Sequence, residues 1–331
     1  MKIQGIDFNP TFCASGARGV FGGYFKHQIW PFRPNWTGST FVAKTTTGPP
    51  HAGNMPLKED GVTPKELSPR CILPNYHSGY RKLSLRMFRL GIMLNAVDLS
   101  NIGAEALLEK GIWQQRTEPF FLSFMSVENT PDKRLNELER FLQLLGNHLD
   151  SFKAPVGLQV NCSCPNAGLN PDDLANIDEV CRGVMLAHRL RIPLMWKFNV
   201  LTPVKDVREI CRRCNHHLGA ICLSNTIHWD DLPRVGIDRQ ELFGTDISPL
   251  HEFGGGALSG KPLLPLVIEW LNKAKLANID THICAGGGIM SSDEIVSLFL
   301  AGADSVSLGC VGTLRPRRVQ AIIRKAQRLF S

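Results

Sequence analysis

The chain has 331 residues, of which 37 are basic and 30 acidic, so its formal net charge is +7; 43% of its residues are hydrophobic. This balance excludes a disordered, collagenous or coiled-coil protein and fits one large domain or two average ones. No run of about 18 apolar residues occurs, and residues 1–10 lack the charged and apolar regions of a signal peptide. We therefore expect a cytoplasmic protein that spans no membrane and whose 10 cysteines are reduced thiols.

The basic excess is spread along the chain, with one cluster in residues 315–328. An isoelectric point near 8.9 is weak support for nucleic-acid binding. An anionic small molecule explains the charge equally well. We expect a small-molecule partner and no nucleic acid, and we interpret the cluster as the solvated face of an outer helix.

Short apolar runs alternate with longer amphipathic runs, as strands and helices do in a parallel α/β protein. The apolar runs predict eight strands: Phe41–Lys44, Gly91–Asn95, Pro119–Phe124, Val156–Asn161, Leu194–Phe198, Ala220–Ser224, His282–Ala285 and Ser305–Gly309. Helix start signals follow three of them, at residues 170–173 (NPDD), at 202–203 (TP) and in the capping box of 291–294. Eight such units predict a (β/α)8 TIM barrel that forms a single domain over residues 1–331.

Residues 46–88 are the irregular part of this pattern. They are rich in Pro, Gly, Lys and Arg and show no clear period. We expect a long loop excursion between the first and second predicted strands. It lies near the active-site mouth or is a surface insertion without a role.

Polar residues collect where the predicted strands end, which is where barrels of this kind carry their reactive side chains. They are Lys44, Asn95, residues 161–166 (NCSCPN), Lys197, Asn225 and Thr226. The seventh predicted strand runs into Gly286–Gly288, and the eighth into Gly309 and Cys310. A glycine triplet alone indicates only a turn, but after the seventh strand it favours a phosphate site, because backbone N–H groups can approach an anion closely there.

Two lysines stand at predicted strand ends, Lys44 and Lys197. A buried ammonium group is costly without an anion, and a single lysine is best explained by a structural ion pair. Two lysines that face a predicted phosphate site favour an anionic ligand. A reduced flavin, which is negative at its N1 and C2 carbonyl edge, suits Lys197.

Two cysteine motifs have plainer explanations. Cys211 and Cys214 suggest a metal site by their spacing, but both fall on the apolar stripe of a predicted helix, so we interpret them as core residues and predict no metal. Cys162 lies two residues before Cys164, and we interpret it as structural.

Seven motifs in the same order resemble those of the dihydroorotate dehydrogenases, and together they span nearly the whole chain. They are residues 9–16 (NPTFCASG), 41–47 (FVAKTTT) followed by 53–54 (GN), 95–101 (NAVDLSN), 161–166 (NCSCPN), 254–262 (GGGALSGKP), 285–289 (AGGGI) and 301–309 (AGADSVSLG).

The resemblance implies an FMN-dependent barrel that oxidises dihydroorotate to orotate in pyrimidine biosynthesis. The base that removes the C5 proton, as C6 delivers hydride to flavin N5, is cysteine in the soluble class 1 of this family and serine in its membrane class. The matching position is Cys164, so the chain resembles class 1. The resemblance also implies a homodimer. It leaves two electron acceptors for the reduced flavin: fumarate, or NAD reached through a separate electron-transfer subunit.

By the same matching, substrate contacts fall on Lys44, Asn95, Asn161, Asn166, Asn225 and Thr226. Cofactor contacts fall on Ser15, Gly16, Lys44, Thr45, Asn161, Lys197, Gly255, Gly256, Gly287, Gly288, Gly309 and Cys310.

Several positions depart from the family pattern. Asp98 and Ala96 stand where the family turn usually has Gly and Ser, Lys58 replaces an Arg, and residues 120–125 lack an Asn. A carboxylate at position 98 can repel an anionic substrate. Two alternatives therefore remain: an FMN oxidoreductase for another pyrimidine such as uracil or dihydrouracil, and a catalytically silent barrel that binds FMN or a phosphate.

Overall fold

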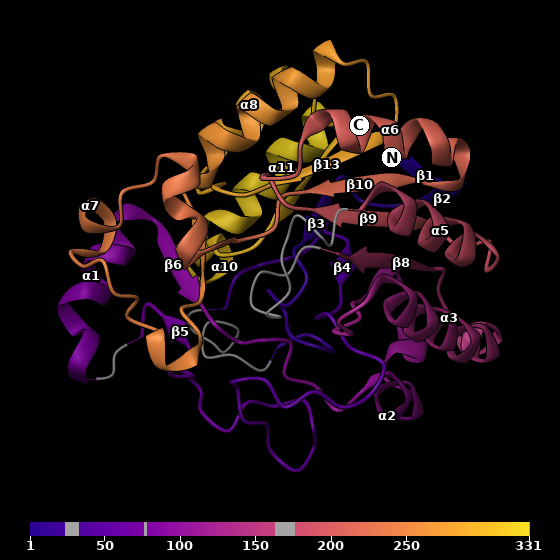
Figure 1. The fold of residues 1–331 in the computed structure, drawn as a ribbon, viewed down its shortest axis with the longest axis horizontal. Coiled ribbons are helices and arrows are strands. Elements are labelled where there is room, and N and C mark those ends of the chain that lie inside the picture. The colour runs from indigo at the N-terminus through magenta and orange to yellow at the C-terminus, as the bar shows by residue number, and fades with distance from the viewer. Residues whose placement is uncertain (24–32, 76–77, 163–175, 331) are drawn as a thin grey trace.

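The computed structural model describes residues 1–23, 33–75, 78–162 and 176–330. Its centre is a sheet of eight parallel strands with helices outside them (Figure 1). In their order around the sheet, the strands are β3 (Thr11–Cys13), β14 (Ser305–Leu308), β13 (His282–Gly286), β10 (Ala220–Leu223), β9 (Leu194–Phe198), β8 (Val156–Asn161), β7 (Phe120–Phe124) and β4 (Phe41–Val42).

The sheet closes into a barrel where its two end strands meet. A parallel bridge joins Phe12 of β3 to Thr40 beside β4. The Cys13 N–H donates to the Thr40 carbonyl at 2.9 Å, and the Thr40 N–H donates to the Thr11 carbonyl at 2.7 Å. These bonds pair the strand edges that an open sheet would leave exposed. The predicted (β/α)8 barrel is confirmed.

The prediction for Gly91–Asn95 was wrong about its place. This segment forms β6 (Ile92–Asn95), but β6 pairs outside the barrel. The eighth barrel strand is β3, which has only three residues. A strand of that length carries too little periodicity to be detected, and only the family resemblance pointed to it.

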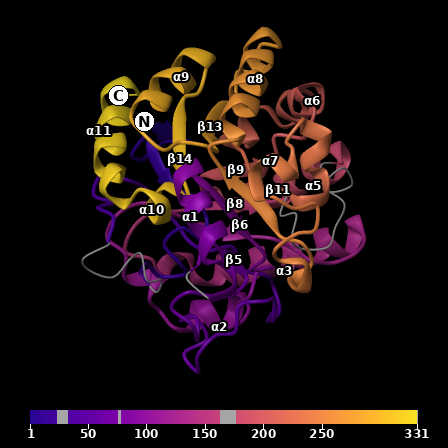
Figure 2. The same cartoon turned by 90° about the vertical axis from the view of Figure 1, so that its left-hand side faces the viewer.

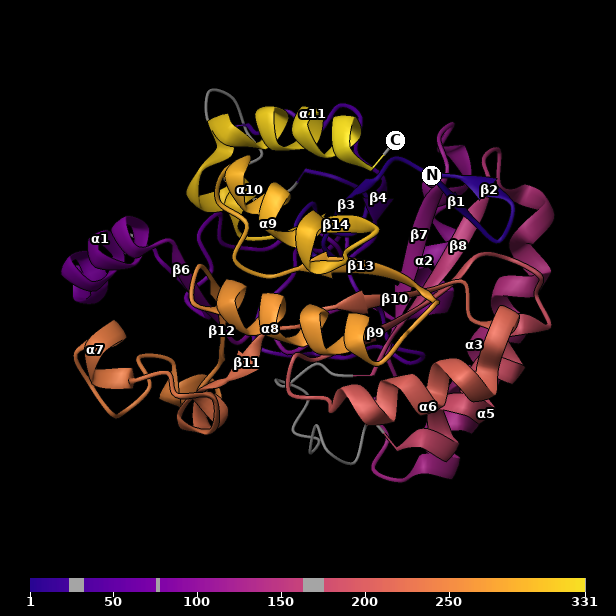
Figure 3. The same cartoon turned by 90° about the horizontal axis from the view of Figure 1, so that it is seen from above.

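Strand β6 belongs to a small antiparallel sheet with a separate apolar core. Its strands in order are β11 (Ile227–His228), β12 (Ala257–Gly260), β6 and β5 (Ile72–Leu73). Leu73, Leu94 and Leu258 are fully buried in it. Figures 1 and 3 show this sheet, with α1 (Arg81–Leu90) and α7 (Arg239–Phe243), on the side toward which the barrel strands point. It therefore borders the carboxyl end of the barrel.

The remaining helices surround the barrel, and in Figure 2 the helices α11, α9, α8, α6 and α5 form an arc around the strands. Their bounds are α2 (Ala104–Glu109), α3 (Pro131–His148), α5 (Ile177–His188), α6 (Val204–Cys214), α8 (Leu263–Leu276), α9 (Asp293–Ala301), α10 (Val311–Leu314) and α11 (Val319–Leu329). No helix among the described residues has both the length and the apolar composition to cross a membrane.

The predicted helix signals can be compared with these bounds. The start signal at 202–203 precedes α6 directly. The capping box forms at α9, where the Ser291 N–H donates to Glu294 Oε2 at 2.7 Å, and Gly302 ends the helix at φ 106°. The predicted start at 170–173 lies outside the described residues.

The stretch 46–88 contains more regular structure than the sequence suggested, namely β5 and α1. The four basic residues of α1 interrupt the apolar pattern. Six residues of this stretch line the large cavity described below: Leu67, Ser68, Pro69, Ile72, Pro74 and Phe88.

The amino end of the barrel is filled by side chains. A hairpin of β1 (Lys2–Ile3) and β2 (Ile6–Asp7) leads to Phe8, whose ring centroid lies 4.9 Å from that of Phe121. The ring of Phe12 lies 5.8 Å from the same ring, edge to face. This packing resembles the layered interior of other barrels and leaves the opposite end for ligands.

Candidate active site

A cavity of about 870 Å³ opens at the carboxyl ends of the barrel strands. Its volume lies in the upper part of the range for small-molecule sites, roughly 300–1,000 Å³. Most of the predicted site residues that the structure describes line it: Ser15, Gly16, Lys44, Thr45, Asn95, Asn161, Lys197, Asn225, Thr226, Gly287, Gly288, Gly309 and Cys310. Residues far apart in the sequence therefore meet at one end of the barrel.

Two of the predicted site residues, Cys164 and Asn166, lie outside the described residues. Two others, Gly255 and Gly256, do not line the cavity; Ser259 and Gly260 of the same motif do. In β12, Ser259 and Gly260 pair with Met93 and Ile92 of β6, and this register brings them to the cavity.

Both predicted lysines are buried in the cavity wall. Lys44 and Lys197 are each only 8% exposed. The Lys44 Nζ donates to the Ser100 carbonyl at 2.8 Å, while Lys197 lies in the middle of the sheet, on β9. Two ammonium groups on a shared cavity wall make it suitable for an anionic ligand.

Two of the predicted asparagines, Asn161 and Asn225, belong to one hydrogen-bond network. The Asn225 Nδ2 donates to Asn161 Oδ1 at 3.0 Å, and the Thr226 N–H donates to Asn225 Oδ1 at 3.0 Å. Asn199, which the sequence analysis did not identify, donates from Nδ2 to the Thr226 carbonyl at 2.7 Å. Asn161 and Lys197 are register partners on β8 and β9. The network holds planar amides beside an ammonium group at the same level of the barrel.

A chain of hydroxyl groups supports the other side of the cavity. The Ser15 Oγ donates to the Ala43 carbonyl at 2.9 Å and lies 2.8 Å from Thr45 Oγ1, which lies 2.9 Å from Ser123 Oγ. Each hydroxyl has one proton, so Thr45 must donate to Ser15 and Ser123 to Thr45. Ser123 occupies the strand where the family pattern has Asn, and it holds Thr45 in place.

Glycines let two segments approach the cavity closely. Gly287 and Gly288 have φ of 105° and 86°, and a Cβ on Gly288 would lie 2.5 Å from Leu264 Cβ. Gly309 and Cys310 line the same wall, and burial raises the pKa of the Cys310 thiol to about 11. The missing Cβ atoms of Gly287 and Gly288 let the loop after β13 lie close against α8.

The turn that follows β6 carries an unexpected carboxylate. Asp98 lines the cavity and has φ 53°, and its neighbour Leu99 has φ 54°. Such a φ favours glycine, which explains the family preference noted above, and Asp is among the residues that tolerate it. Burial raises the pKa of this carboxyl group, although the nearby charges of His51 and Lys44 act in the opposite direction.

Cys162 follows β8 directly. Its Sγ donates to the Lys197 carbonyl at 3.2 Å, and burial raises its pKa to about 12. A thiol with such a pKa stays protonated near neutral pH and is a poor base or nucleophile. This geometry fits the structural role that we expected for Cys162.

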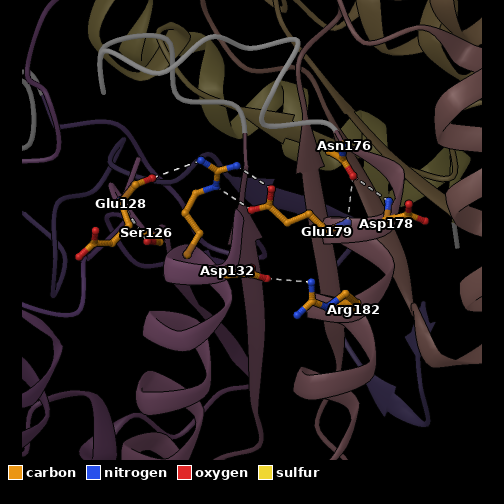
Figure 4. Close-up of polar contacts among 8 residues, drawn as sticks. Ser126, Glu128, Asp132, Asn176, Asp178, Glu179 and Arg182 are labelled. Atoms are coloured by element: carbon orange, nitrogen blue, oxygen red, sulfur yellow. Dashed lines mark hydrogen bonds and ion pairs between the residues drawn. The ribbon is translucent and has the colours of Figure 1, made fainter. Parts of the chain in front are cut away.

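The start of α5 is anchored by polar contacts that Figure 4 shows. The Asn176 side chain accepts hydrogen bonds from the Asp178 and Glu179 N–H groups. Glu179 also accepts two bonds from Arg134 on α3, at 2.7 and 2.6 Å. Arg134 and Glu179 have side chains only 7% and 12% exposed, so this buried ion pair fixes the helix that begins at residue 177.

The described residues contain no cluster of three His, Cys, Asp or Glu side chains that could hold a metal ion. Cys211 and Cys214 are buried along α6.

The fold and the cavity define a parallel barrel whose carboxyl end holds a cavity with two buried lysines in its wall. The family model for dihydroorotate dehydrogenase matches residues 78–329. This match covers well over half of the chain, and the chain belongs to the dihydroorotate dehydrogenase family.

Relatives agree with this assignment. The chain is 30% identical over 244 residues, 70% of each protein, to the catalytic subunit of dihydroorotate dehydrogenase B (NAD(+)) of Geotalea daltonii. It is 27% identical over 320 residues to the subunit of the same name of Endomicrobium trichonymphae, and the match covers 95% of this chain and 86% of that one. Such subunits are class 1 enzymes, so the predicted class is confirmed.

The fold resembles that of dihydroorotate dehydrogenase from Eimeria tenella in complex with ferulenol. The TM-score is 0.66 at 19% identity, and the match covers 100% of this chain and 87% of that one. This similarity supports the barrel fold.

Proposed function

We propose that this protein oxidises dihydroorotate to orotate in pyrimidine biosynthesis and that it uses FMN in the cavity at the carboxyl end of the barrel. The observation that carries this proposal is the meeting of Lys44, Asn161, Lys197 and Asn225 in one cavity in a chain that belongs to the dihydroorotate dehydrogenase family.

The residues present fit a flavin phosphate and a flavin ring. Gly287, Gly288 and Gly309 line the cavity where the loops after the last two barrel strands meet, and this is the usual phosphate site of such barrels. The buried Lys197 ammonium suits the edge of the ring that becomes negative on reduction. FMN bound here supplies the acceptor for the hydride that leaves substrate C6.

The chain's own residues then bind and orient the pyrimidine. Lys44 holds the substrate carboxylate, since it is a cation at the wall beside the asparagines. The amides of Asn161 and Asn225 match the imide edge of the ring, because an amide both donates and accepts. Cys164 removes the C5 proton, and the C5–H electron pair forms the new ring double bond as hydride leaves C6.

We further propose a homodimer in the cytoplasm that passes electrons to a second subunit. The relatives named as catalytic subunits of an NAD(+) enzyme support this arrangement. The described cysteines are all free thiols, which suits a reducing compartment.

Substitution of the proposed base tests the mechanism. Cys164→Ser should keep its yellow flavin but slow flavin reduction by dihydroorotate at least 100-fold, in line with the roughly 10²–10⁴-fold contribution of a positioned base. The measurement is anaerobic stopped-flow absorbance of the flavin.

Cys162→Ser is the matched control, because serine can keep the hydrogen bond to the Lys197 carbonyl. Its flavin should be reduced at the wild-type rate. An unchanged rate in Cys164→Ser would overturn the base assignment. A wild-type protein that binds no flavin, or whose flavin dihydroorotate does not bleach, would overturn the proposed function.

A further inference from the structure

Among the described residues that line the cavity, one charged group is not used by the proposed reaction, the carboxylate of Asp98. It lies on the same cavity wall as Lys44, the proposed anchor for the substrate carboxylate. Its position in the left-handed region, at φ 53°, gives the side chain an orientation that an ordinary extended residue would not have.

The turn that carries Asp98 is held in place from both sides. The Asn54 N–H donates to the Val97 carbonyl at 3.1 Å, and Ser100 Oγ donates to the same carbonyl at 3.0 Å. A Cβ on Gly53 would lie 2.3 Å from the Asp98 carbonyl oxygen, so the two segments are in close contact. The carboxylate therefore cannot leave the cavity by a simple movement of the turn.

One oxygen of this carboxylate has no hydrogen-bond partner among the described residues. Within the described part of the chain, Asp98 Oδ1 is buried and makes no hydrogen bond. The charges of His51 and Lys44 act on this group. An asparagine would tolerate the same φ without the charge. Because the carboxylate also lines the cavity, its charge can act on a bound ligand.

We propose that Asp98 determines the ligand selectivity of the cavity: it weakens the binding of a pyrimidine that carries a ring carboxylate relative to the same ring without one. The reason is electrostatic. A ligand carboxylate at Lys44 approaches Asp98, and two negative charges in a buried site repel each other more strongly than in water.

This inference rests on the proposed function, since Lys44 is taken as the carboxylate anchor. The test is calorimetric titration of the holoprotein with orotate and with uracil, which is the same ring without the carboxylate. Asp98→Asn keeps the shape and the tolerance of positive φ but removes the charge. It should strengthen orotate binding about tenfold while the Kd for uracil stays within about twofold of wild type.

Asp98→Gly is the second variant. It also removes the charge, and glycine adopts the positive φ at this position without strain. Asp132→Asn removes a carboxylate from α3, where the side chain is 79% exposed, and should change neither Kd. An unchanged ratio of the two Kd values in both Asp98 variants, or weaker orotate binding in them, would overturn the inference.

Turnover separates this result from the proposed function. If wild-type protein oxidises dihydroorotate but the Asp98 variants keep the wild-type ratio of the Kd values for orotate and uracil, only the selectivity role is overturned. If wild-type protein does not oxidise dihydroorotate but the ratio of the two Kd values shifts as expected in the Asp98 variants, only the proposed reaction is overturned. Protein that binds neither pyrimidine overturns both.

Discussion

At the scale of single residues, the cavity depends on positions where a side chain is absent or unusually placed. Gly288 has φ 86° and lies against the start of α8. Asp98 accepts a similar backbone conformation and brings a charge with it. Close approach of the backbone and one additional carboxylate thus set what the cavity can hold.

Gly288→Ala should abolish flavin binding. The new Cβ would lie 2.5 Å from Leu264 Cβ and 2.7 Å from its backbone nitrogen, so the loop at the phosphate wall must move. The measurement is the flavin content of the purified protein and its Kd for added FMN.

Gly236→Ala separates backbone strain from this steric effect. Gly236 has φ 72° but nothing within 4 Å of its added Cβ. It should lose about 1 kcal/mol of stability and keep its flavin. Full flavin occupancy in Gly288→Ala would contradict the role of this glycine.

At the scale of secondary structure elements, two ion pairs join the same helices in different environments. Arg134 of α3 and Glu179 of α5 have side chains 7% and 12% exposed. Asp132 of α3 and Arg182 of α5 have side chains 79% and 62% exposed. Removing one partner of a buried pair leaves the other charge buried without its partner and lowers stability. An exposed pair contributes little to stability because water screens it.

Arg134→Met should lower the free energy of unfolding by about 3 kcal/mol, because it leaves the Glu179 carboxylate buried without its partner. Urea denaturation followed by circular dichroism measures this change. Arg182→Met is the control and should cost less than about 0.5 kcal/mol. Equal losses in the two variants would show that burial of the pair is not what matters.

How much could be read from the sequence also differs between elements. Long apolar strands such as β8 and β9 were predicted with their bounds, because burial on both faces leaves a continuous apolar run. The three-residue β3 gave no such run, and β6 was assigned to the wrong sheet, since an apolar segment does not say which neighbour it pairs with. Helix α1 was not predicted, because its basic residues interrupt the apolar pattern and only a narrow side of it is buried.

For the site, the strand-end rule predicted part of the cavity lining, including Lys44, Asn161 and Lys197, because the carboxyl ends of parallel strands must meet. The glycine motif at 254–260 is the exception: its second half reaches the cavity, because the pairing of β12 with β6 brings Ser259 and Gly260 there. Asn199 and Ser123 support site residues from behind through side-chain hydrogen bonds. Such contacts depend on the folded arrangement and leave no local pattern in the sequence.

At the scale of the whole molecule, the barrel separates stability from chemistry. One end is filled by the rings of Phe8, Phe12 and Phe121, and the other end opens into the cavity. A change at the filled end should therefore alter how strongly the protein resists unfolding and leave ligand binding alone.

Phe8→Ala should lower the free energy of unfolding by about 3–4 kcal/mol, because Phe8 is 5% exposed and its ring lies 4.9 Å from that of Phe121. The Kd for flavin should stay within about twofold of wild type. Thermal unfolding and flavin titration measure the two quantities. Phe299→Ala, at a side chain that is 41% exposed, is the control and should lose less than about 1 kcal/mol. A large loss of flavin affinity in Phe8→Ala would contradict this separation of the two ends.

The position of β14 in the barrel has a consequence for how the protein folds during synthesis. Strand β3 lies between β4 and β14, and β14 is the last strand of the chain, at residues 305–308. Until the ribosome has added residues 305–308, the barrel lacks β14, and the edges of β3 and β13 that pair with it stay open. Such an incomplete barrel offers unpaired edges to other chains. The nascent protein should therefore need protection from association until β14 has emerged.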